Sequence, residues 1–187
     1  MKNIITILFL VTPLFLSAQY KSPTRLFGKG QIDVKAGVGV LSTYMKDNPQ
    51  TVVPPVSLGA DWFVANNISL GAYAGYSKSN SRPSEDLSYA TNETFIADVR
   101  LGFHYTKIDR LNVYGGLSVG YQQVNITPSN PELTKTMENT GMKEQSSKMI
   151  YTGFVGTQYA ISPRYSVFGE LGYGISILRF GLGYRIK

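Results

Sequence analysis

The residues best suited to chemistry are few, and their spacing does not form an active site. His104 is the only histidine, and the sequence contains no cysteine. A hydrolase built on this histidine would need a serine and an acid to complete a catalytic triad. Thr106, rather than a serine, follows two residues after His104. We therefore expect His104 to be a hydrogen-bonded interior residue and predict that the protein is not an enzyme.

The sequence also lacks the patterns that hold metals and cofactors. One histidine, no cysteine and no acidic run with calcium-loop spacing leave no recognisable metal site. The glycines at 115–116 and 181–183 lie in strand-like segments, with no strand–loop–helix unit to cradle a phosphate. We predict no catalytic, cofactor-binding or metal-binding residues.

The segments that must position the remaining charged residues alternate between apolar and small or polar side chains. This period of two is typical of a β-strand with two different faces. Segments of about ten residues are long enough for tilted strands to cross a bilayer. The sixth segment is ambiguous because Ile150 and Phe154 break its parity. The eight apolar faces begin at Ile32, Val56, Ile68, Phe95, Val113, Tyr151, Tyr165 and Leu178.

The first residues read as a targeting segment. Lys2 precedes an apolar run over 4–16, and Ser17-Ala18 offers a small-residue cleavage site. We predict a signal peptide at 1–18 and a single β-barrel domain at 19–187. No later apolar run is long enough for a transmembrane helix.

Short and long connections alternate between the segments. The short ones cover 65–67, 106–112 and 160–164, and the long polar ones cover 45–55, 78–94 and 126–149. Bacterial outer-membrane barrels have short periplasmic turns and long extracellular loops. We expect Val64 to face Ile68 across the first short turn. A type II′ turn at Gly174-Ile175 is expected to place Glu170 opposite Arg179.

Aromatic residues fall near both ends of the segments, where amphipathic rings form girdles at the two membrane interfaces. Those expected at the short-turn end are Trp62, Tyr105, Tyr159, Tyr165 and Tyr184, and those at the long-loop end are Tyr44, Tyr76, Tyr121, Tyr151 and Tyr173. The pattern predicts a transmembrane antiparallel up-and-down β-barrel of eight strands, located in the cell outer membrane.

The second face of the segments carries four acids and four bases. A barrel of about eight strands is filled by side chains, and buried charges are costly unless paired. We therefore predict a lumenal charge network and a closed lumen, with Arg179 and Arg185 near the level of Asp33 and Lys35. The network consists of Asp33, Lys35, Asp61, Asp98, Arg100, Glu170, Arg179 and Arg185.

The final strand carries a local motif, Arg179-Phe180-Gly181-Leu182-Gly183-Tyr184-Arg185-Ile186. Together with the eight segments, it resembles the small outer-membrane β-barrel family that includes OmpX and the membrane domain of OmpA, over essentially the whole mature chain. The resemblance implies that Arg179, Gly181, Tyr184 and Ile186 form a C-terminal assembly signal for the barrel assembly machinery. This chain departs from the family by ending on Ile186-Lys187 rather than on phenylalanine.

The sequence pI of about 9.4 reflects an uneven distribution of charge rather than a nucleic-acid surface. Basic residues at the short-turn end would meet lipid headgroups. They are Lys21, Arg25, Lys29, Lys107, Arg110, Arg164 and Lys187, against the single acid Asp109.

Three functions remain for such a barrel. We predict a structural or surface-interaction role with a closed lumen, in a monomer whose partners are outer-membrane lipids and possible surface partners of the long loops. The alternatives are a narrow porin-like channel and a lipid A-modifying enzyme. The 126–149 segment is expected to be an exposed, mobile loop.

Overall fold

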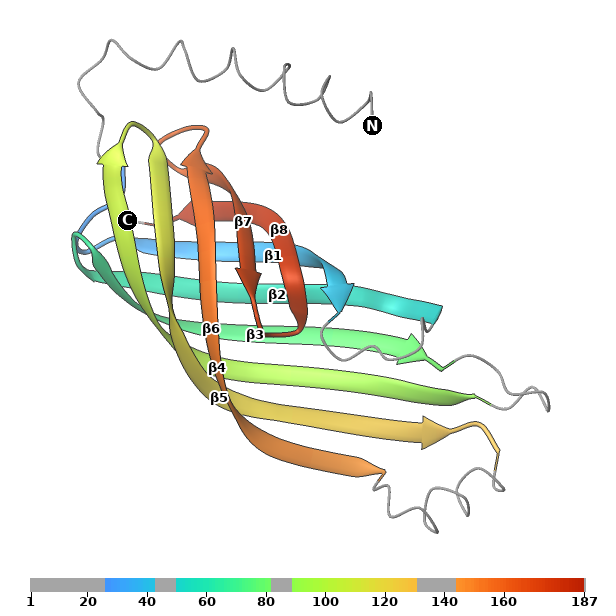
Figure 1. The fold of residues 1–187 in the computed structure, drawn as a ribbon. Coiled ribbons are helices and arrows are strands. Elements are labelled where there is room, and N and C mark those ends of the chain that lie inside the picture. The colour runs from blue at the N-terminus through green and yellow to red at the C-terminus, as the bar shows by residue number, and fades with distance from the viewer. Residues whose placement is uncertain (1–25, 43–49, 82–88, 131–143, 187) are drawn as a thin grey trace, which may run out of the picture.

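The computed structural model describes residues 26–42, 50–81, 89–130 and 144–186, and these form a closed antiparallel β-barrel (Figure 1). Neighbouring strands follow each other in sequence around the barrel, and β1 pairs with β8 to close it. The described residues contain no helix able to cross a membrane. The predicted signal peptide, Tyr44 and most of the 126–149 loop lie outside the described residues.

The eight predicted strands are all present. They are β1 (Ile32–Ser42), β2 (Gln50–Ala65), β3 (Ile68–Asn80), β4 (Ala90–Ile108), β5 (Leu111–Pro128), β6 (Gln145–Ala160), β7 (Tyr165–Gly172) and β8 (Ser176–Arg185). The fold class predicted from the alternating pattern is confirmed.

The long-loop ends of the strands extend further than the sequence predicted. β5 continues to Pro128 and β6 begins at Gln145, so pairing covers both ends of the predicted 126–149 loop. β3 and β4 likewise pair from Asn80 opposite Thr91. The sequence did not predict these extensions, because they lack the clear apolar alternation of the lipid-facing segments.

Two turns differ from the predicted geometry. Ala65, rather than Val64, pairs with Ile68, because a register shift between Phe63 and Ala65 shortens the first turn to Asn66-Asn67. Glu170 does lie opposite Arg179. The turn between them is not type II′, which requires a positive φ at its first central residue. Among the described glycines, only Gly30 has a positive φ, so Gly174 does not adopt that conformation.

The two faces of the sheet have opposite chemistry. Apolar side chains point outward, as illustrated by Val99, Leu117 and Leu182, which are 61%, 66% and 66% exposed. Charged and polar side chains point inward and are buried. This is the reverse of a water-soluble barrel and fits an outer face solvated by lipid. The sixth outward face follows Tyr151, Val155 and Tyr159, which resolves its ambiguous parity.

Strands β7 and β8 are much shorter than their neighbours. They contain 8 and 10 residues, whereas β4 and β5 contain 19 and 18. Figure 1 shows β3 to β6 continuing well past the β7–β8 turn as a projecting sheet at the long-loop end. On β6, pairing with β7 begins only at Phe154, although pairing with β5 begins at Gln145.

Candidate functional site in the barrel lumen

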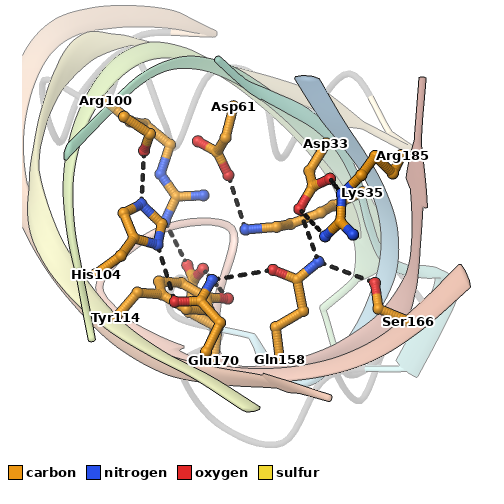
Figure 2. Close-up of polar contacts among 12 residues, drawn as sticks. Asp33, Lys35, Asp61, Arg100, His104, Tyr114, Gln158, Ser166, Glu170 and Arg185 are labelled. Carbon is orange, nitrogen blue, oxygen red and sulfur yellow. Dashed lines mark hydrogen bonds and ion pairs between the residues drawn. The ribbon is translucent and has the colours of Figure 1, made fainter. Parts of the chain in front are cut away.

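The buried charged side chains of the described residues gather in the lumen, on strands around the barrel (Figure 2). The inward positions of each strand alternate with lipid-facing ones, so the period of two delivers every second side chain to the interior. Because several strands contribute at similar heights, residues distant in sequence meet across a narrow barrel.

The central ion cluster joins β4, β7 and β8. Glu170 Oε1 accepts a hydrogen bond from Arg100 Nη2 at 2.7 Å and another from Arg179 Nη2. Its second oxygen, Oε2, accepts one from the Tyr114 hydroxyl at 3.0 Å. All four side chains are buried. One carboxylate therefore links both arginines across the barrel.

Two further ion pairs involve β1. Lys35 Nζ donates to Asp61 Oδ2 at 2.7 Å. Arg185 Nε donates to Asp33 Oδ1 at 3.0 Å, which connects the last strand to the first. Asp33 is opposite Arg185 in the register, whereas Arg179 is opposite Gly39. The expectation that Arg179 shares the level of Asp33 and Lys35 is therefore wrong, because it lies six residues along β8 from Arg185.

Asp98 does not join an ion pair within the described residues. Its Oδ1 is buried and lacks a hydrogen-bond partner there. The four acids and four bases of the sequence suggested four matched pairs. Instead, Glu170 forms ion pairs with both Arg100 and Arg179, and Asp98 pairs with neither. Asp98 instead lines a lumenal cavity of about 20 Å³ beside Arg100 and Arg179. That volume is enough for about one water molecule.

Aromatic rings cover the buried cations. Arg100 lies 3.6 Å from the Phe154 ring centroid, and Arg179 lies 4.3 Å from that of Tyr73. Lys35 Nζ is 4.3 Å from the centroid of Tyr114. A cation over an aromatic face is stabilised by the negative face of the ring. These rings also fill the lumen around the ion pairs.

An apolar cluster lies inside the barrel toward each end. At the short-turn end, Phe27 packs with Phe63 and Ala160, and the Arg185 guanidinium lies 4.5 Å from the Phe27 ring centroid. At the other end, Ile175 of the β7–β8 turn packs with a buried cluster completed by Tyr73, Ile96 and Ile150. The sequence did not predict either cluster, because Phe27 precedes the first alternating segment and Ile175 was assigned to an ordinary turn.

His104 has the serine neighbour that the local sequence lacked. Its Nε2 lies 2.8 Å from Ser69 Oγ on β3, and its Nδ1 lies 3.1 Å from Asn112 Oδ1 on β5. The hydrogen-bonded chain continues through Gln158 to Asp33. All three members of the trio are buried, and an amide occupies the place of the triad's acid. The arrangement matches the expected hydrogen-bonded interior histidine.

The described residues contain no group of histidine, cysteine or acidic side chains arranged to hold a metal ion. The residues of the C-terminal motif all lie on or beside β8. Arg179 faces the lumen at Glu170, and Gly181 lies opposite Gly37. Tyr184 and Ile186 are exposed on the outside.

A closed sheet with an apolar outer band and a polar, filled interior defines a transmembrane β-barrel. No protein-family model and no curated protein sequence matches the chain. Solved structures do. Ail, the attachment invasion locus protein of Yersinia pestis, is 16% identical, with a TM-score of 0.51 over 86% of this chain and 99% of Ail.

Two further comparisons agree. The structure of Ail in a phospholipid bilayer nanodisc gives a TM-score of 0.52 at 15% identity, over 84% of this chain and 100% of Ail. The outer membrane protein OprG of Pseudomonas aeruginosa gives 0.50 at 12% identity, over 86% of this chain and 97% of OprG. The chain has the fold of small eight-stranded outer-membrane barrels, and its lipid-facing band fits a place in the cell outer membrane.

Proposed function

We propose that the protein is a non-enzymatic outer-membrane barrel with a closed lumen, serving a structural or surface-interaction role. The observation that carries this proposal is the cross-linked interior. Glu170 joins β7 to β4 and β8, and Asp33 joins β1 to β8. Apolar clusters around Phe27 and Ile175 lie at the two ends of this network.

The projecting sheet supports the surface-interaction part of the proposal. The β3–β6 extensions stand beyond the short β7–β8 hairpin (Figure 1). An extended antiparallel sheet outside the bilayer presents backbone edges and side chains on which a partner could bind. We further propose that the chain is a monomer, and that Arg179, Gly181, Tyr184 and Ile186 are read by the barrel assembly machinery during insertion.

Conductance in planar bilayers tests the closed lumen. The refolded protein, shown to be folded by its heat-dependent gel mobility, is expected to give no steady single-channel current. An open, steady pore in the unmutated protein would contradict the closed lumen and favour the porin-like channel. Deacylation of labelled lipid A that disappears on His104→Ala would instead favour the enzyme.

A further inference from the structure

We propose that the β4–β5 and β6–β7 turns form a binding site for the headgroup of an anionic phospholipid in the leaflet that meets the short turns. The phosphate would lie among Lys107, Arg110 and Arg164, with Ile108 and Ile161 against its acyl chains. The proposal concerns the outside of the barrel and does not depend on whether the lumen conducts.

The charge at the two ends of the barrel is unequal. The described part of the short-turn rim carries four exposed basic residues and one acid, Asp109. The basic residues are Lys29, Lys107, Arg110 and Arg164. At the described long-loop end, Lys78 and Lys148 are balanced by Glu93 and Glu144. Among the described residues, therefore, the short-turn rim has an excess of positive charge that can attract an anionic surface, whereas the long-loop end has none.

One backbone hydrogen bond links the β4–β5 turn to the end of β6, and a second links the β6–β7 turn to β8. The Ala160 N–H at the end of β6 donates to the Arg110 carbonyl at 2.8 Å. The Arg185 N–H donates to the Arg164 carbonyl, also at 2.8 Å. Arg110 adopts a φ of 56°, which is uncommon for a residue other than glycine. The tight turn and its bond to β6 thus fix Arg110 at the rim.

Each turn combines basic and aliphatic side chains at the membrane boundary. Ile108 is 48% exposed beside Lys107, and Ile161 is 55% exposed three residues before Arg164. The aromatic girdle runs directly beside them through exposed Tyr105, Tyr159 and Tyr165. Girdle rings mark the level of the lipid headgroups. Cations at that level with exposed isoleucines beside them match a phospholipid, which has a charged head and apolar chains.

Spin-labelled lipids provide the test. The full barrel is reconstituted in phosphatidylcholine vesicles, and electron paramagnetic resonance compares its association with labelled phosphatidylglycerol and labelled phosphatidylcholine. We expect a preference for phosphatidylglycerol that falls on Lys107→Gln, Arg110→Asn and Arg164→Gln combined. Asparagine is chosen at 110 because it tolerates a positive φ. A basic residue near an anionic lipid surface contributes about fivefold to binding.

Lys148→Gln, which removes a positive charge at the long-loop end, is the matched control and should keep the preference. If the triple variant does not fold, Lys107→Gln and Arg164→Gln are tested singly, and each should weaken the preference. Equal association of both lipids with the native barrel, or a preference unchanged in the rim variants, would overturn the proposal. Loss of the preference on adding inorganic phosphate, but not chloride of equal ionic strength, would assign the site to free phosphate instead.

Discussion

Asp33 and Arg185 join the first strand of the barrel to the last, as Cα partners across the β1–β8 seam with Arg185 Nε 3.0 Å from Asp33 Oδ1. Almost the whole barrel sequence lies between these two residues. The pair can therefore form only when β8 pairs with β1 and the sheet closes. Both side chains are buried, at 1% and 9% exposure.

Breaking this seam pair should weaken the barrel. Asp33→Ala leaves Arg185 without its carboxylate partner, and removing one member of a buried ion pair costs about 3–5 kcal/mol. We expect a lower unfolding temperature in detergent, followed by the gel mobility of heated samples. Glu93→Gln is the control, because its pair with Lys78 is about one-third exposed and such surface pairs contribute about 0–1 kcal/mol. Equal losses in both variants would show that burial does not decide the effect.

Changing Glu170 should affect both stability and permeability. Glu170→Ala removes the shared partner of Arg100 and Arg179 and leaves two buried cations facing each other. We predict a loss of about 3–5 kcal/mol if the arginines stay dry, and less if water enters. Melting curves measure the loss of stability, and planar-bilayer recordings measure the change in permeability.

Asp98→Ala is the comparison for Glu170, because Asp98 lines the same cavity without an ion pair in the described residues. It should change stability much less than Glu170→Ala. A larger loss at Asp98 would mean that Glu170 is not the main junction of the network.

The hydrogen bond between Ser69 and His104 has room to form because residue 102 is a glycine. A Cβ at Gly102 would lie 2.6 Å from Ser69 Oγ and 2.9 Å from His104 Nε2. Gly102→Ala should therefore destabilise the barrel by roughly 1–3 kcal/mol through overpacking. At lipid-facing Gly153 the nearest atom to a new Cβ is 3.8 Å away, so Gly153→Ala should be close to neutral in the same unfolding measurement.

The closed sheet should make the folded protein resistant to detergent. All strands have neighbours and no lateral edge runs the length of the barrel. We expect unheated samples in cold dodecyl sulfate to migrate differently from heated ones. If verified folded and heated samples migrate identically, the sheet does not stay closed in detergent.

Protease added to intact cells tests the orientation. Long extracellular loops are the expected targets, so trypsin should cut first at Lys135 or Lys143 in the predicted 126–149 loop. The short turns should be protected on the periplasmic side. First cleavage at Lys107 or Arg164 would invert the assigned topology.

The number of strands, the barrel class and the two faces of every strand except the sixth could be predicted from the sequence. The reason is that a strand in a bilayer must alternate between lipid and interior, so patterns such as Leu70-Gly71-Ala72-Tyr73 record both environments directly. The sequence also placed Glu170 opposite Arg179, because no register shift interrupts the β7–β8 pairing and the count from the turn therefore holds.

Which interior groups meet could not be predicted from the sequence, because it depends on how the strands pack around the lumen. Ser69 and His104 are 35 positions apart, and their contact follows from β3–β4 pairing rather than from local spacing. Glu170 reaches Arg100 directly across the lumen, which leaves Asp98 without an ion pair in the described residues. Phe27 and Ile175, which lie outside the alternating segments, complete the two apolar clusters. The alternation along a strand shows which face of the sheet a side chain lies on. Its partner depends on its height along the barrel axis, its length and the packing around it.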